Sequence, residues 1–178
     1  RDFKLSTEEM ALLASVCDAF HREGKKVVVI LNIGGVIETA MWKNLPDAIL
    51  LAWQAGQEGG NSVADILSGK QNPSGRLAVT FPIGYFDVPS SANFPSNYQL
   101  KPDQIIKSLT NQGIEKGNEK DVDYTNYEEG IYVGYRYFDT FKKNVSYPFG
   151  YGLSYTSFDY GTPSVKQSKD GFTVTLSI

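Results

Sequence analysis

The sequence has little of the chemistry that builds disulfide-linked, zinc-binding or nucleic-acid-binding proteins. Its 178 residues include one cysteine, Cys17, and one histidine, His21. One cysteine cannot form an internal disulfide, and these two residues are too few for a structural zinc site. The formal net charge is -3 without a run of like charges, so the basic stripe of a nucleic-acid-binding domain is missing. We therefore expect neither a metal nor a nucleic-acid partner.

Long apolar runs are also missing. No stretch of about 20 apolar residues could span a bilayer, and the chain opens on charged residues rather than on an apolar signal core. We expect no membrane partner, and the residues do not choose between a periplasmic, secreted or cytoplasmic location. The turn Asn32-Ile33-Gly34-Gly35 lacks the glycine spacing and the downstream acid of a dinucleotide site, so we expect no cofactor.

A helix is predicted over residues 7–23. Ser6 and Glu9 have the spacing of a capping box, in which each side chain bonds the other residue's backbone amide. Apolar residues then recur at three- and four-residue steps, and Gly24 suits a left-handed stop. Glu8 and Glu9 are therefore interpreted as helix-start charges and His21 as a residue of the last turn.

Strands and helices alternate after this helix, as in α/β layer folds. Residues 27–31 are continuously apolar and mostly β-branched, which predicts a parallel strand covered on both faces. Residues 48–53 repeat that character, and the glycine-rich turn 56–60 leads into a helical pattern at 63–67. A further strand is predicted at 76–81, and the tyrosine-rich run 130–139 is interpreted as strand-like.

The residue pattern changes twice in the second half of the chain. After Pro82 the residues are mostly those of surface loops. From Tyr155 the pattern alternates, with Phe172, Val174 and Leu176 facing one way, which predicts the first strands of an all-β module. A complete sandwich needs about 100 residues, so the remaining residues supply only its beginning.

The carboxylates are spread in small groups, at Glu8 and Glu9, at Glu58, at Asp121 and Asp123, and at Glu128 and Glu129. Trp53, Gln57 and Glu58 follow a predicted strand, and α/β sheets bind ligands beyond the carboxyl ends of their strands. These three residues are the candidates for a substrate cleft. The alternative for Glu58 is a carboxylate that caps a helix or braces a loop, and one of Glu128 and Glu129 is expected to pair with Arg136 or a loop amide.

Six motifs in this order resemble glycoside hydrolase family 3, in particular its bacterial β-glucosidases. They are 53–61 (WQAGQEGGN), 64–69 (ADILSG), 72–77 (NPSGRL), 80–82 (TFP), 130–139 (GIYVGYRYFD) and 148–155 (PFGYGLSY). The opening Asp2-Phe3-x-Leu5-Ser6 is similar as well. The resemblance covers nearly the whole chain except about 97–121, which we expect to be a variable insertion.

The resemblance implies a three-layer α/β sandwich and a place in a larger enzyme. In that family a (β/α)8 barrel carries the nucleophilic aspartate and the following α/β sandwich carries the acid/base glutamate. Residues 1–154 would be the later part of that sandwich, and 155–178 the beginning of a fibronectin-type-III-like domain. The glutamate is expected upstream of Arg1 and the aspartate in the barrel, so no residue of this chain is predicted to be catalytic.

The implied activity is retaining hydrolysis of terminal β-D-glucosyl residues from oligosaccharides or glucosides, with the remainder of the enzyme as partner. Three alternatives stay open: a carbohydrate-binding or interaction module without catalysis, a β-xylosidase, and a β-N-acetylglucosaminidase. We also expect apolar surface to be exposed around strand 27–31 or around residues 172–178. Exposed apolar strands favour association with further polypeptide.

Overall fold

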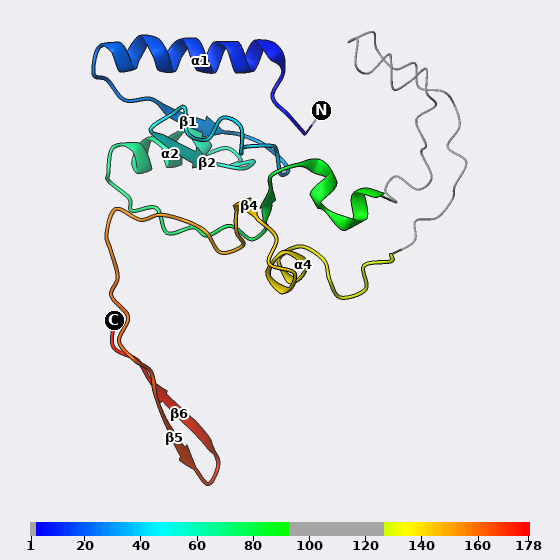
Figure 1. The fold of residues 1–178 in the computed structure, drawn as a ribbon. Coiled ribbons are helices and arrows are strands. Elements are labelled where there is room, and N and C mark those ends of the chain that lie inside the picture. Colours follow the sequence, from blue (N-terminus) through cyan, green and yellow to red (C-terminus); the bar gives the residue numbers. More distant parts are fainter. Residues whose placement is uncertain (1–2, 93–126) are drawn as a thin grey trace. The chain divides into compact units, whose positions relative to one another are not determined.

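The computed structural model describes residues 3–92 and 127–178 (Figure 1). They form two compact units, one of Arg1–Ala55 with Leu77–Tyr151 and one of Gly56–Arg76 with Gly152–Ile178. The predicted insertion at about 97–121, and with it Asp121 and Asp123, lies outside the described residues. The α/β class is confirmed as a mixed fold with small sheets, whereas the three sandwich layers stay a prediction.

The first helix forms as the sequence predicts. Helix α1 is Thr7–Arg22, with Ser6 as its N-cap. The Ser6 hydroxyl accepts from the Glu9 amide at 3.1 Å, and the Glu9 carboxylate accepts from the Ser6 amide at 2.8 Å. At the other end, Gly24 has a φ of 68° and ends the helix in the left-handed conformation.

Strands β1 (Val28–Leu31) and β2 (Ala48–Leu51) lie parallel, with Val28 opposite Ala48 and Leu31 opposite Leu51. Figure 1 shows α1 running above this pair. Beneath α1 lies the core of the first unit. Its buried members are Leu31, Ile33, Ile37 and Trp42, and Leu5, Met10, Leu13, Val29, Ile49, Leu51 and Trp53 pack against them.

The prediction that β1 is covered on both faces is wrong for the described residues. Val29 and Leu31 belong to the core, but Val28 and Ile30 on the opposite face are 43% and 44% exposed. Because side chains alternate along a strand, one face of β1 is packed and the other is open. The expected exposure of apolar surface around this strand is thereby confirmed.

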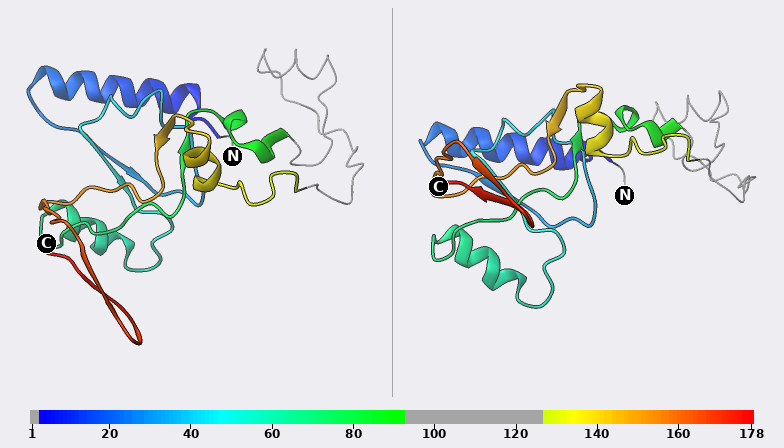
Figure 2. Two further views of the ribbon diagram at one scale, coloured as in Figure 1. Left: turned by 60° about the horizontal axis from the view of Figure 1, so that its bottom comes forward. Right: turned by 90° about the horizontal axis from the view of Figure 1, so that it is seen from below.

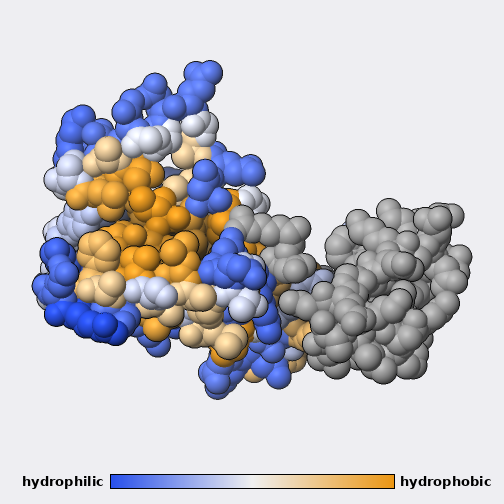
Figure 3. Space-filling view, turned by 90° about the horizontal axis from the view of Figure 1, so that it is seen from above, coloured by the Kyte–Doolittle hydropathy of each residue, from blue (hydrophilic) through white to orange (hydrophobic). Residues whose placement is uncertain are grey.

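Helix α1 also leaves apolar side chains uncovered. Seen from the side of α1, the surface carries a broad apolar patch (Figure 3). Leu12 and Phe20 of this helix are 66% and 45% exposed. No helix of the described residues combines the length and the apolar character that crossing a membrane would require.

The strand predicted at 76–81 is much shorter in the structure. Strand β3 is Phe81–Pro82 and pairs antiparallel with β4 (Val145–Tyr147), with a register irregularity at Phe81 and Pro82. Proline has no amide hydrogen with which to continue a ladder, so the pairing stops there. Upstream, Leu77 exchanges one pair of backbone hydrogen bonds with residues 150 and 151, too few for a regular strand.

The tyrosine-rich run contains a helix instead of the expected strand. Helix α4 is Tyr135–Thr140, preceded by the 3-10 helices η1 (Tyr85–Asp87) and η2 (Pro89–Ala92) in the same unit. Gly134 has a φ of 58°, which breaks an extended run directly before α4. The rings of Tyr137 and Phe141 then contact each other at helical spacing, with centroids 5.2 Å apart, and Phe138 is buried.

The second unit contains helix α2 (Gly59–Leu67) and strands β5 (Ser164–Ser168) and β6 (Gly171–Thr175). The strands form an antiparallel hairpin, visible from two further directions in Figure 2, with Val165 opposite Val174. The expected exposure of this segment is confirmed, because Phe172 and Val174 are 70% and 64% exposed. The domain boundary at 154 stays a prediction.

Candidate functional site

The carboxyl ends of β1 and β2 meet at one edge of their sheet. Asn32 follows β1 and Trp53 follows β2, and the Ala52 amide donates to the Leu31 carbonyl at 2.9 Å, extending the pairing. In parallel α/β sheets this edge is where ligands bind. Because β1 and β2 are parallel, the residues that follow these two strands lie at the same edge.

Gln54 is a residue of this edge that the sequence analysis missed. A Cβ atom at Gly34 would lie 2.8 Å from the Gln54 Nε2, so the glycine allows the amide to lie against the backbone after β1. In the sequence, this contact is indicated by the glycine pair 34–35 after one predicted strand and by the polar residue Gln54 after the next predicted strand. A carboxamide at this position can both donate and accept hydrogen bonds, as recognition of a hydroxylated ligand requires.

Trp53 is held in a conformation that a tryptophan rarely adopts. Its φ is 49°, a left-handed value that costs a residue with a Cβ roughly 1–2 kcal/mol. The ring packs against the core cluster and lies 6.3 Å from the Phe81 ring, centroid to centroid. Such strain persists where the surroundings fix the backbone, and it is found preferentially at functional sites. Trp53 thus combines a packing role with the strained geometry of a site residue.

Glu58 has a local structural role within the second unit. It occupies the N-cap position of α2, but its side chain bonds no backbone amide there. Instead its Oε2 accepts from the Asn61 Nδ2 at 2.6 Å, which braces the first turn. Gln57 and Glu58 are both exposed. Trp53 belongs to the other unit, so a shared cleft of Trp53, Gln57 and Glu58 stays a prediction.

Glu8 and Glu129, two of the remaining carboxylates in the described part of the chain, differ in their surroundings. Hydrogen bonds from its own amide and from the Ser6 hydroxyl lower the pKa of Glu8, whereas a general acid needs a raised pKa. Glu129 has its Oε2 buried without a hydrogen-bond partner among the described residues. The predicted pairing with Arg136 is not observed, because that guanidinium lies over the Tyr135 ring, 5.9 Å from its centroid.

A second polar cluster, also missed in the sequence, joins the loop before β2 to β4. Thr39 and Ser146 are 1% and 6% exposed, and their hydroxyls hydrogen-bond at 2.7 Å across 107 residues of chain. The Lys43 ammonium donates to the Ser146 carbonyl at 2.7 Å and lies 4.7 Å from the centroid of the Tyr147 ring. Nothing in the sequence pairs these residues, since they come from separate segments.

Glu38 is buried beside this cluster, at 3% exposure. Its Oε1 accepts from the Met41 amide at 2.8 Å, and its carbonyl accepts from the Trp42 indole at 2.7 Å. The carboxylate therefore stabilises the turn that places Trp42 in the core. A buried carboxylate is stable only when it is hydrogen-bonded, and this turn supplies such a bond.

Asp47 connects the end of α1 to the start of β2. It accepts from the Lys26 ammonium at 2.8 Å, from the Val27 amide at 2.8 Å, and bonds the His21 ring at 2.9 Å. These contacts, led by Lys26, hold the pKa of Asp47 far below its usual range. Among residues 3–92 and 127–178, no three His, Cys, Asp or Glu side chains gather as metal ligands would.

Residues 1–155 match the glycosyl hydrolase family 3 C-terminal domain. This match covers well over half of the 178 residues. The chain belongs to glycosyl hydrolase family 3. The family resemblance inferred from the six motifs is thereby confirmed.

Curated relatives from this family carry two activities in their names. The chain is 40% identical over 162 residues to β-glucosidase A of Butyrivibrio fibrisolvens, which covers 88% of this chain and 16% of that protein. It is 37% identical over 175 residues to an exo-α-(1->6)-L-arabinopyranosidase of Bifidobacterium longum, covering 98% of this chain and 19% of that protein. This family 3 chain thus spans less than a fifth of the length of these relatives.

Solved structures are similar in sequence and in fold. β-Glucosidase 3B of Thermotoga neapolitana, solved in complex with glucose, is 48% identical with a TM-score of 0.76, over 93% of this chain and 20% of that one. A glycoside hydrolase family 3 β-glucosidase of Bifidobacterium adolescentis is 34% identical with a TM-score of 0.72, over 99% of this chain and 22% of that one.

Proposed function

We propose that this family 3 chain is part of a retaining β-glucosidase that removes terminal β-D-glucosyl residues from oligosaccharides or glucosides. The observation that carries the proposal is the 48% identity, at a TM-score of 0.76, to a β-glucosidase solved with glucose. In a retaining mechanism one carboxylate attacks the anomeric carbon and a second group acts first as acid and then as base.

Within this proposal, residues 1–178 supply scaffold and cleft residues rather than the two catalytic carboxylates. The carboxylates of Glu9 and Glu58 are engaged in helix-start contacts, and that of Glu38 in a buried turn. Trp53 and Gln54 at the strand edge are the best placed to face a sugar, with Gln57 and Glu58 as further candidates. The three-layer sandwich over 1–154 and a fibronectin-type-III-like module from 155 belong to the same proposal.

The test is a labelling experiment on the full-length enzyme that carries this chain. A 2-deoxy-2-fluoro-β-glucoside traps the glycosyl-enzyme intermediate of a retaining glucosidase, and peptide mapping locates the labelled carboxylate. We expect the label outside residues 1–178. Hydrolysis of an aryl β-glucoside by the isolated chain, abolished by Glu58→Gln or Glu129→Gln, would show that the catalytic carboxylate lies inside it.

A second candidate activity is exo-α-L-arabinopyranosidase. The 37% identity over 98% of the chain to the Bifidobacterium longum enzyme favours it specifically. The two activities are separated by comparing kcat/KM for 4-nitrophenyl β-D-glucopyranoside and 4-nitrophenyl α-L-arabinopyranoside with one preparation. The β-glucosidase proposal expects the glucoside to be preferred; preference for the arabinoside would overturn it.

A further inference from the structure

We propose that the cavity between η1 and the segment after α4 binds a neutral sugar at a site separate from the strand edge. The cavity has a volume of about 410 Å³ and lies wholly within the first unit. Ligand pockets typically measure about 300–1,000 Å³, so a sugar ring fits. It is lined by Ile83, Phe86, Asp87, Tyr137, Lys143 and Asn144.

The walls of the cavity are held in place by contacts within the protein. The Gly84 amide donates to the Asp87 Oδ2 at 2.7 Å, which fixes that carboxylate and leaves its Oδ1 without a described partner. The Lys143 amide donates to the Phe138 carbonyl at 2.8 Å. The Tyr137 ring contacts those of Phe138 and Phe141, with centroids 5.3 and 5.2 Å away. The walls are therefore organised without an occupant.

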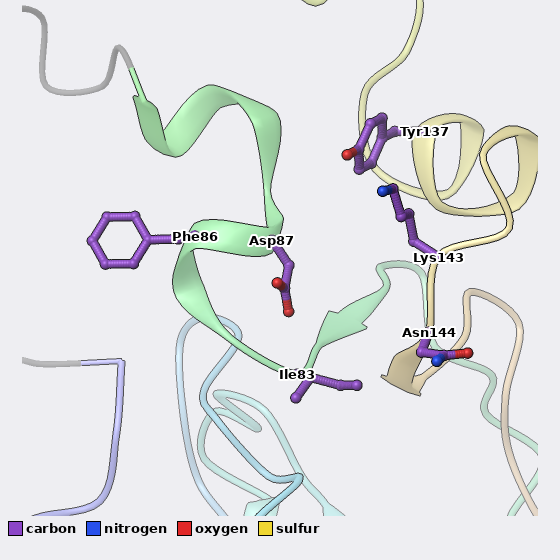
Figure 4. A pocket seen from close by; sticks show the side chains of 6 residues that line it. All are labelled: Ile83, Phe86, Asp87, Tyr137, Lys143 and Asn144. Atoms are coloured by element: carbon purple, nitrogen blue, oxygen red, sulfur yellow. The ribbon is translucent and has the colours of Figure 1, made fainter.

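The polar groups of the cavity are available to a ligand. Figure 4 shows Asp87 on one side, with Tyr137 and Lys143 on the side of α4 and Asn144 below them. Asp87 and Lys143 form no ion pair with each other, although both line the same space. Their charges are thus separated across the cavity rather than neutralised by direct contact.

The charges select the class of ligand. The Asp87 carboxylate disfavours an anion and the Lys143 ammonium disfavours a cation. A hydroxyl group can donate to the carboxylate and another can accept from the ammonium, while the Asn144 amide does both. Ile83 and the Tyr137 ring in the wall offer apolar surface to the C–H face of a ring, whereas the Phe86 ring points away from the other lining side chains (Figure 4). A neutral polyhydroxylated ring satisfies all of these groups together.

The choice of a sugar over another neutral polyol rests on the proposed function, because a glycosidase works amid its substrate and product sugars. The experiment keeps the two proposals apart. Hydrogen–deuterium exchange of the full-length enzyme is followed with and without methyl β-D-glucopyranoside, and aryl β-glucoside hydrolysis is assayed on the same preparation. Failure of hydrolysis refutes the proposed function, whereas the exchange of peptides 83–87 and 138–144 decides on the cavity.

We expect the glucoside to slow exchange in both peptides by a factor of about 1 + [L]/Kd, which is about tenfold at a concentration of nine times Kd. Lys143→Gln and the isosteric Asp87→Asn should abolish this protection while hydrolysis continues. Lys142→Gln, one residue away and outside the cavity lining, is the matched control and should retain it. Two separate variants guard against one that fails to fold.

Three results would overturn the proposal. The first is unchanged exchange in both peptides at a glucoside concentration that saturates the enzyme. The second is equal loss of protection in Lys142→Gln and Lys143→Gln, which would place the effect elsewhere. The third is protection by glycine but not by the glucoside, which would assign the separated charges to a zwitterion.

Discussion

The buried hydrogen bond between Thr39 and Ser146 gives the sharpest test of how the first unit is held together. The two hydroxyls are 2.7 Å apart and shielded from water, at 1% and 6% exposure. Thr39→Val removes one hydroxyl at nearly constant volume, and Ser146→Ala removes the other. Each single change leaves the remaining hydroxyl buried without its partner, at a cost of about 1–3 kcal/mol in the free energy of unfolding.

The double variant should cost less than the sum of the singles, because it leaves no orphaned hydroxyl. The free energy of unfolding of all four proteins is measured by urea denaturation, with the fluorescence of the buried Trp42 as signal. We expect a coupling energy of about 1 kcal/mol or more, as residues in direct contact show. The Lys43 bond goes to the Ser146 backbone carbonyl, so Ser146→Ala leaves it intact.

Additivity within about 0.5 kcal/mol would refute this reasoning, because that is the scatter of independent sites. Ser15→Ala combined with Thr39→Val is the control cycle. The Ser15 hydroxyl donates to the Ala11 carbonyl on the exposed surface of α1, whereas the Thr39 hydroxyl bonds Ser146. That cycle should be additive.

Three further predictions concern stability. Ser6→Ala removes the N-cap of α1 and should lower the free energy of unfolding by about 1 kcal/mol, measured by urea denaturation. The pKa of Asp47 is lower in the folded state than its value of about 4 in the unfolded chain, so its stabilising contribution is complete above about pH 4 and is lost as the pH falls further. Asp47→Asn should therefore flatten the fall in melting temperature below about pH 4. A Cβ at Gly152 would lie 2.5 Å from the Gly75 carbonyl, so Gly152→Ala should cost about 1–3 kcal/mol, whereas Gly60→Ala, with open space at its Cβ, should not destabilise.

Local signals explain which elements could be read from the sequence. Helix α1 was placed within one residue because its capping box, apolar spacing and terminal glycine all act within a few residues of each end. Helix α4 was mistaken for a strand because alternating tyrosines resemble a pleated pattern. The helix is instead determined by Gly134, whose φ is 58°, and by the contact of Tyr137 with Phe141. The alternation of residue types in the sequence reveals neither feature.

For the candidate site, the sequence likewise predicted the location but not the detailed contacts. That Asn32 and Trp53 share a sheet edge follows from two parallel strands, which their apolar runs indicate. The close approach of Gln54 to Gly34, the left-handed φ of Trp53 and the bond of Glu58 to Asn61 depend on backbone conformations and rotamers. Such details are set by tertiary packing rather than by the order of residues, so the sequence named the region but not its contacts.

The open faces link the fold to the size of the relatives. Val28 and Ile30 expose one face of β1, and Phe172 and Val174 expose one face of the hairpin. Burying one such side chain contributes roughly 1.5–3 kcal/mol, against a net domain stability of about 5–15 kcal/mol. A two-stranded sheet is also marginally stable without further layers. Since the β-glucosidase 3B match covers only 20% of that chain, we infer that further polypeptide covers these faces in the proposed enzyme.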